Sequence, residues 1–340
     1  MNNMRDIPAI PDSFNPQEEA KESKTLIAYH ADCIDGFTSA WVCYKGLTEA
    51  RGVDPDSITL FPTAYDRLPE LLAEISTYNL IYIVDFSLPL DSLLSLQRHL
   101  PQYLPTRKIT IIDHHKTAWD AYAGDLKSER YTGTVYGTEV ILDLNECGAS
   151  LVWNHFFPEE PMPILIRYVK DYDLWTHKRA YTKEVDRFLR LQPQTLKAWT
   201  ALAALFEDEI WTTDTIQIGK SLLDQHSQIV DDIVETATPI TLDGVLGLSA
   251  NCTPNFSNDV GERLARISDT FGSTWSQTGK SQVKFSLRSI GDSCDVEKIA
   301  GVFGGGGHRN AAGFTLSNPD GDPMSVQVWD TGVEEENRDA

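Results

Sequence analysis

The sequence predicts a two-lobed α/β protein, in which a mostly parallel sheet flanked by helices forms the N-terminal lobe and a smaller α/β domain forms the C-terminal lobe. Three observations predict this fold class. Short apolar runs alternate with amphipathic helical segments over residues 24–193, a stretch of helical periodicity covers 194–237, and a second set of strands and helices fills 238–331. Strand and helix alternation of this kind is typical of right-handed, parallel α/β units.

Each element of the first lobe follows from its apolar pattern. Strands and helices alternate from the start, and proline opens the last helix at a position that a helix tolerates. The expected strands are 25–29, 58–63, 80–84 and 109–112, and the expected helices are 37–47, 67–76 and 88–100. Residues 130–144 contain a short edge strand or two, followed by helices over 148–157 and 161–175.

The second lobe begins after the helical linker. Asp243 and Gly244 lie between two apolar runs and predict a hairpin turn. The other expected elements are helices at 257–267 and 296–303 and strands at 273–275, 283–287, 314–316 and 325–329. Residues 1–23 are expected to form a solvated arm, and the acidic tail 332–340 is expected to be disordered.

Composition limits the class of protein. No segment approaches the roughly 20 apolar residues of a membrane helix, and the N-terminus lacks the apolar core of a signal peptide, which predicts a cytoplasmic location. The five cysteines have no paired spacing and are expected to be reduced. With 29 basic and 50 acidic residues, a formal net charge of -21 favours a small anionic substrate over long duplex nucleic acid, although the acidic surface also aids solubility.

Polar side chains follow three of the predicted strands where each strand ends. His30 ends the first strand, with Asp32 and Asp35 just beyond it, and Asp85 ends the third. The apolar run Ile109 to Ile112 leads into Asp113, His114 and His115. Because ligands gather at the carboxyl ends of strands in such sheets, we expect these side chains to lie along one rim. Mixed imidazole and carboxylate ligation is typical of manganese, zinc or iron, and two such ions side by side suit hydrolysis of a phosphate ester.

A second group of candidate residues lies in the C-terminal lobe. Gly304, Gly305, Gly306 and Gly307 are followed by His308 and Arg309. Glycines can present bare backbone N–H groups to an anion, and the cationic side chains, together with Arg288, can hold a phosphate. A flexible loop is the alternative for the glycines alone, and the neighbouring histidine and arginines favour binding.

These motifs, HADCIDG, VDFS, DHH and GGGGHRNAAGF, resemble in order and separation those of the DHH phosphoesterases with the DHH-associated C-terminal domain. The resemblance covers about Leu26 to Phe314 and points to the branch that includes oligoribonucleases. It implies a two-lobed enzyme with a pair of divalent ions, manganese in particular and Mg²⁺ or Co²⁺ as alternatives. Its second lobe would bind the substrate.

The resemblance also implies residue roles. By position, the expected metal ligands are His30, Asp32, Asp35, Asp85, His114 and Asp171, with Asp173 in reserve for Asp171. His115 resembles a residue that polarises the substrate phosphate or helps to position the metal site, and Asp113 resembles a support that fixes a histidine tautomer. Arg288, His308 and the glycines resemble the phosphate and nucleotide grip. One departure concerns Asp32: the aspartates here follow His30 by two and five residues, whereas many relatives have them four and six residues after the histidine.

The expected activity is hydrolysis of short oligonucleotides to mononucleotides. The alternatives are cleavage of a small nucleotide, such as 3′-phosphorylated adenosine monophosphate or a cyclic dinucleotide, and a catalytically silent nucleotide-binding regulator. A long single-strand exonuclease fits less well because no basic and aromatic track accompanies the motifs. The oligomeric state stays open, a homodimer included.

Overall fold

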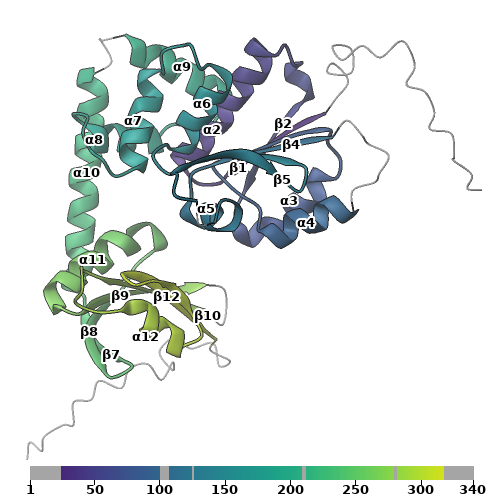
Figure 1. The fold of residues 1–340 in the computed structure, drawn as a ribbon. Helices are drawn as coiled ribbons and strands as arrows, with labels where there is room; N and C mark the ends of the chain where they lie inside the picture. The colour runs from purple at the N-terminus through teal and green to yellow at the C-terminus, as the bar shows by residue number, and fades with distance from the viewer. Residues whose placement is uncertain (1–23, 100–106, 125, 209–211, 279–281, 318–340) are drawn as a thin grey trace, which may run out of the picture. The chain divides into compact units, whose positions relative to one another are not determined.

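The computed structural model describes residues 24–99, 107–124, 126–208, 212–278 and 282–317 (Figure 1). These residues form two compact units that divide between Leu222 and Leu223, inside one long helix. Each unit has its own six-stranded sheet with helices packed on it, which confirms the predicted two-lobed α/β class. The domain limits drawn from the sequence stay predictions, and the expected arm, tail and strand 325–329 lie outside the described residues.

The first sheet is parallel except at one edge. In spatial order its strands are β2 (Ile58–Thr63), β1 (Thr25–His30), β3 (Leu80–Val84), β4 (Lys108–Asp113), β6 (Thr138–Asp143) and β5 (Arg130–Val135). Only β5 is antiparallel to its neighbour, because a short hairpin turn joins it to β6. Strands β1, β3 and β4 are apolar and buried on both faces, as expected for the centre of a parallel sheet. Their carboxyl ends therefore meet at one edge.

Helices cover both faces of this sheet (Figure 1). The face with the larger core carries α2 (Ile34–Lys45), α6 (Gly148–Phe156), α7 (Ile164–Asp173), α8 (Thr182–Arg190) and α9 (Leu196–Glu207). The other face carries α3 (Leu68–Ile75), α4 (Leu90–His99) and α5 (Lys116–Tyr122). Helix α2 continues into a π-helical turn, η1 (Gly46–Ala50), and 3₁₀ turns η2 (Pro55–Ser57) and η3 (Tyr65–Arg67) flank β2.

The second unit is a mostly antiparallel sheet that follows α10 (Thr212–Glu235). Its strands, in spatial order, are β11 (Gly306–His308), β12 (Ala311–Ser317), β10 (Gln282–Ser289), β9 (Phe271–Thr278), β8 (Val245–Asn251) and β7 (Thr238–Leu242). A 3₁₀ turn, η5 (Pro254–Phe256), leads into α11 (Ser257–Ser268), and α12 (Val296–Val302) contributes to a separate core on the same sheet. The predicted Asp243–Gly244 turn is present, with both residues at positive φ.

The sequence predicts no membrane-spanning helix. None of these helices combines the length and the apolar character needed to cross a bilayer.

Candidate metal centre

The ends of β1, β3 and β4 bring the predicted residues together at one edge of the first sheet. These strands are neighbours and parallel, and their last paired positions are adjacent in register. His30 is the final residue of β1, Asp85 follows β3 directly, and Asp113 ends β4 just before His114 and His115. The sequence expectation that the polar strand ends share one rim agrees with this arrangement.

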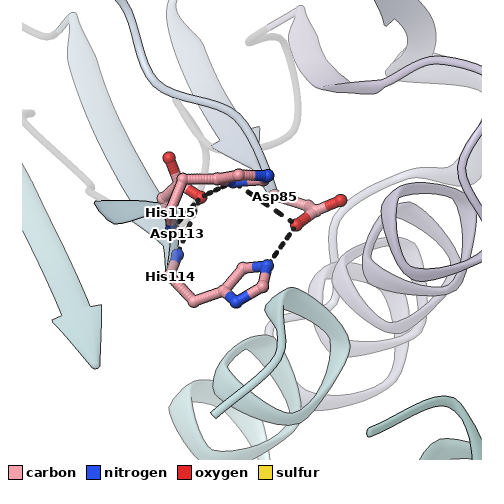
Figure 2. Close-up of side chains that lie close together, drawn as sticks. All are labelled: Asp85, Asp113, His114 and His115. Atoms are coloured by element: carbon pink, nitrogen blue, oxygen red, sulfur yellow. Dashed lines mark hydrogen bonds and ion pairs between the residues drawn. The ribbon is translucent and has the colours of Figure 1, made fainter. Parts of the chain in front are cut away.

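Asp85 is almost fully buried, and Figure 2 shows the rings of His114 and His115 near one of its carboxylate oxygens. The Nε2 atom of His114 lies 3.1 Å from one of its carboxylate oxygens, and the Nδ1 atom of His30 lies 3.6 Å from the other. The backbone of Asp85 has φ of 53°, in the left-handed region that few non-glycine residues adopt. Such strain is typical of functional sites, where the surrounding structure holds it.

Asp35 approaches the cluster from the first turn of α2. Its carboxylate accepts hydrogen bonds from the backbone N–H groups of Gly148 (2.6 Å) and Ala149 (2.9 Å), at the start of α6. One Asp35 oxygen also lies 3.8 Å from Nε2 of His114. Helix N-termini stabilise carboxylates in this way. This contact could not be predicted from the sequence, because nothing in the local pattern pairs residues 113 positions apart.

Gly148 is the residue that lets α6 come this close. A Cβ atom there would lie 2.6 Å from Cβ of Asp85 and 2.8 Å from Oγ of Ser39. Since real Cβ atoms do not approach other heavy atoms so closely, any side chain at position 148 would displace Asp85 or the helix.

The structure places Asp173, not Asp171, beside the cluster. A carboxylate oxygen of Asp173 lies 3.5 Å from Nε2 of His114. Asp171 faces away, because residues two apart on a helix point in nearly opposite directions. Our assignment of the fourth carboxylate therefore moves from Asp171 to Asp173.

Asp171 has a different set of contacts. Its carboxylate accepts hydrogen bonds from the hydroxyl of Thr176 (2.5 Å), the backbone N–H groups of Lys178 and Arg179 (both 2.9 Å) and the hydroxyl of Thr182. Although burial works against the charged form, these donors lower the pKa of Asp171 to about 2. Asp171 thus organises the loop that follows α7.

Asp32 and Cys33 occupy unequal positions around the first motif. Asp32 is exposed, has φ of 54°, and belongs to none of the groups of closely spaced donor atoms found among the described residues. The Sγ atom of Cys33 lies within 4.8 Å of donor atoms of His30 and Asp85. Burial, followed by the charges of Asp85 and Asp35, raises the pKa of the Cys33 thiol, which keeps it protonated and disfavours it as a thiolate ligand.

Asp113 is fully buried and fixes His115. Its Oδ1 atom accepts hydrogen bonds from the backbone of His114 (2.7 Å) and from Nδ1 of His115 (2.7 Å), while Oδ2 accepts from the hydroxyl of Ser87 (2.6 Å). Asp113 therefore holds the proton of His115 on Nδ1 and leaves Nε2 to face outward. The supporting role predicted for Asp113 requires such a contact with a histidine, and that role stays a prediction.

Electrostatic interactions within the cluster are strong. Burial and the nearby charge of Asp85 raise the pKa values of Asp35 and Asp173. Burial opposes protonation of His114, yet Asp85, Asp35 and Asp173 raise the pKa of its imidazole to about 10. For Asp85 the contacts with His114 and His30 outweigh burial and lower the pKa. The three carboxylates thus repel one another, and positive charge nearby would stabilise their ionised forms.

The donor set fits divalent cations. Both carboxylate oxygens of Asp85, Oδ2 of Asp173 and Nδ1 of His30 are buried and lack a hydrogen bond within the described part of the chain. Buried polar atoms without partners are costly and rare in folded proteins. Carboxylate oxygens and imidazole nitrogens that converge in this manner are the ligands of manganese and related ions.

The predicted second group lies in the other unit and adopts a different local structure. Gly306 to His308 form β11, which pairs with β12, so the glycines precede a hairpin and not a helix. Gly305 and Gly307 are needed for packing, since a Cβ at either would lie 2.1 to 2.5 Å from a backbone oxygen, and Gly304 has φ of 75°. Gly306 is exposed, and its missing side chain would meet no atom within 4 Å.

The cationic residues of this group are only partly available. Arg288 donates hydrogen bonds to the carbonyl of Leu287 and to the side chain of Asn258, and burial lowers the pKa of its guanidinium. Arg309 forms an ion pair with Asp292 at 3.1 Å, and His308 is exposed. Their substrate-binding roles stay predictions.

Comparison with known proteins identifies the fold. No family model matches the chain. A solved structure described as the DHH domain of a member of a ribosomal-protein family superposes with a TM-score of 0.56 at 12% identity, over 89% of this chain and 84% of that one. The chain has the DHH-domain fold. The fold that the resemblance implies is thereby confirmed.

Two curated proteins are similar to this chain in sequence. An uncharacterised protein of Acanthamoeba polyphaga mimivirus is 28% identical over 329 residues, which cover 92% of this chain and 72% of the relative. The oligoribonuclease NrnB of Bacillus subtilis (strain 168) is 25% identical over 236 residues, which cover 62% of this chain and 53% of NrnB. The similarity to an oligoribonuclease agrees with the predicted class of enzyme, a hydrolase of phosphoester bonds.

Proposed function

We propose that this chain is a two-metal phosphoesterase that hydrolyses short oligonucleotides to mononucleotides. The observation that carries the proposal is the cluster of Asp35, Asp85, His114, Asp173 and His30, in which buried carboxylate oxygens lack a hydrogen bond within the described part of the chain. Similarity to an oligoribonuclease supports the choice of substrate class. The net charge of -21 agrees with a short substrate, because a long polyanion would be repelled.

Three groups of closely spaced donor atoms lie among the described residues, and two of them suggest how two ions would be held. Asp35, His114 and Asp173 form one group, and His30 lies with Asp85 in another. Asp85 contacts histidines of both groups, so it would serve both ions. When bound, such a pair of ions supplies an activated water and stabilises charge on the phosphoryl oxygens.

The remaining chemistry belongs to residues of the chain. Because Asp113 accepts a hydrogen bond from Nδ1 of His115, Nε2 is the atom that His115 would use toward the substrate. Nε2 of the neutral ring can accept a proton, whereas Nε2 of the imidazolium, which Asp113 stabilises, can donate a hydrogen bond to a phosphoryl oxygen or a proton to the leaving oxygen. Ser87 keeps the carboxylate of Asp113 in this orientation. In the second unit, Arg288, His308, Arg309 and the backbone of Gly304 to Gly307 are the proposed grip on the rest of the substrate.

Manganese, with Mg²⁺ or Co²⁺ as alternatives, is the proposed metal because the donor set mixes imidazole with carboxylate. A panel of dinucleotides, longer oligomers, cyclic dinucleotides and nucleoside bisphosphates, assayed with Mn²⁺ and with chelator, tests the function. We expect the shortest oligonucleotides to be turned over fastest and His114→Ala to abolish turnover. Faster cleavage of a cyclic dinucleotide or a nucleoside bisphosphate would overturn the substrate choice. Full manganese-dependent activity in His114→Ala would overturn the metal centre.

A further inference from the structure

An exposed tryptophan lies beside the metal centre and has no role in the chemistry described above. Trp175 is 74% exposed, the largest exposed fraction among the large apolar side chains of the described residues. It lines one pocket together with Tyr172, Asp35 and Asp173. Two proposed metal ligands and an exposed indole thus share one pocket.

The backbone of the loop after α7, which carries Trp175, is strained at three residues. Trp175, His177 and Tyr181 all have positive φ, at 52°, 44° and 66°. These backbone angles are unfavourable for bulky residues and persist only where other contacts enforce them. Asp171 supplies those contacts, through its carboxylate and through a backbone oxygen that accepts from the N–H groups of Thr176 (3.1 Å) and His177 (3.3 Å).

Neighbouring rings also hold the indole of Trp175 in place. Trp175 stacks on Tyr172 at a centroid distance of 6.1 Å and an interplanar angle of 30°, and the ring of His177 meets its edge at 5.5 Å. The guanidinium of Arg190 lies 5.7 Å from the centre of the Tyr172 ring and is anchored to buried Asp186 at 2.7 Å. A platform fixed in this way loses little conformational entropy when a ligand stacks on it.

We infer that Trp175 is the stacking platform for a nucleobase of the substrate, and that it selects nucleotides over other phosphoesters at the metal centre. The inference rests on the proposed function for its choice of phosphate ligand. Every base has a flat π-face, so stacking on an indole favours nucleotides without reading their sequence. An exposed apolar ring next to phosphate-binding chemistry has a clear use only when a flat apolar group accompanies the phosphate.

A matched pair of ligands tests this role without any turnover. Adenosine 5′-monophosphate and ribose 5-phosphate carry the same sugar and phosphate, and only the first has a base. Calorimetric titration of the Mn²⁺-loaded protein measures the affinity of each. Since alanine substitution at a base-stacking aromatic residue costs about 5- to 150-fold in affinity, the wild type should prefer the nucleotide by a factor in that range.

The variants separate stacking from structure. Trp175→Ala should lose the preference for the nucleotide while it keeps its affinity for ribose 5-phosphate, and Trp175→Phe should keep most of the preference. Tyr136→Ala is the matched control, because Tyr136 is another exposed aromatic residue at positive φ, in the turn between β5 and β6. It should bind both ligands as the wild type does.

The outcomes distinguish this inference from the proposed function. A wild type that binds both ligands equally, or binds neither, overturns the stacking role, and so does a Trp175→Ala variant that keeps its preference. Absence of turnover on every oligonucleotide in the panel overturns the proposed function instead, because the titrations do not require hydrolysis. Thermal melting of each variant shows that the fold is intact.

Discussion

Replacement of Asp171 or of Asp173 by asparagine, both at the end of α7, is expected to have opposite effects on stability and on activity. Asp171→Asn should destabilise the first unit, because its carboxylate accepts four hydrogen bonds and an amide would point its NH₂ group at two of these donors. From the strength of hydrogen bonds to charged groups, we expect a loss of about 2 to 4 kcal/mol in the free energy of unfolding. For a unit of this size the loss corresponds to a fall in melting temperature of roughly 4 to 16 °C.

Asp173→Asn should have little effect on stability, or increase it slightly when metal is absent. Asp173 lies near His114, but it also raises the pKa of Asp35, as expected for neighbouring carboxylates, so removal of its charge relieves repulsion. The same change removes a proposed metal ligand and should reduce manganese-dependent turnover at least a hundredfold, as expected for loss of a group that stabilises the transition state by about 3 kcal/mol or more.

Two assays on the same pair of variants check this contrast. Thermal melting in chelator reports the stability of the fold, and turnover of a dinucleotide at saturating Mn²⁺ reports the metal centre. The reasoning would be refuted if Asp171→Asn melted like the wild type and lost manganese-dependent turnover while Asp173→Asn kept it.

Three further substitutions test neighbouring parts of the account. Gly148→Ala should destabilise the fold by about 1 to 3 kcal/mol and abolish activity, because the added Cβ would lie 2.6 Å from Cβ of Asp85. Thermal melting and turnover are measured for this variant and for Gly301→Ala. Gly301 is a helical position with open space around it, so its substitution should change neither property. Ser87→Ala removes the hydroxyl that orients Asp113 and should lower kcat roughly tenfold, with little change in the Mn²⁺ affinity measured by calorimetry. If Ser87→Ala instead lost as much Mn²⁺ affinity as His114→Ala, Ser87 would belong to the metal centre itself. Gly306→Ala should fold normally, since nothing lies within 4 Å of the new methyl group, yet raise KM for a dinucleotide if substrate approaches this backbone; an unchanged KM would remove Gly306 from the proposed grip.

The strands and the rim of the first sheet could be predicted from the sequence because their signals are local. The apolar runs that form β1, β3 and β4 bury both faces, and each leads directly into its polar residues. Parallel strands end at a common edge, so the positions of His30, Asp85 and His114 at or just after the carboxyl ends of strands were enough to predict that they converge.

Asp171 and Asp173 show where this reasoning stops. Both end α7, and the side of the helix that each faces depends on the helix rotation and on donors from residues that follow it, Thr176 and Thr182. The missed helix α8 supplies part of this environment, and its pattern of Val185 and Leu189 among charged residues is a weak signal. Contacts such as that between Asp35 and Gly148 depend on packing between distant segments.

The glycine-rich segment shows a second limit. Four successive glycines suggest an anion-binding loop, yet most of them are explained by the sheet: Gly305 and Gly307 allow close strand contacts, and Gly304 has a positive φ. Composition alone does not separate a glycine required by the fold from one required by a ligand, and of these four only Gly306 has neither a packing contact nor a positive φ to explain it.

The central claim is that the buried carboxylates and histidines at the ends of β1, β3 and β4 bind divalent metal. Calorimetric titration of metal-free protein with Mn²⁺, for the wild type and for Asp85→Asn, tests it most directly. The account predicts two ions per chain for the wild type and loss of both high-affinity sites in Asp85→Asn, since Asp85 contacts histidines of both donor groups. A folded wild type that binds no Mn²⁺, or an Asp85→Asn variant that binds it equally well, would contradict the account.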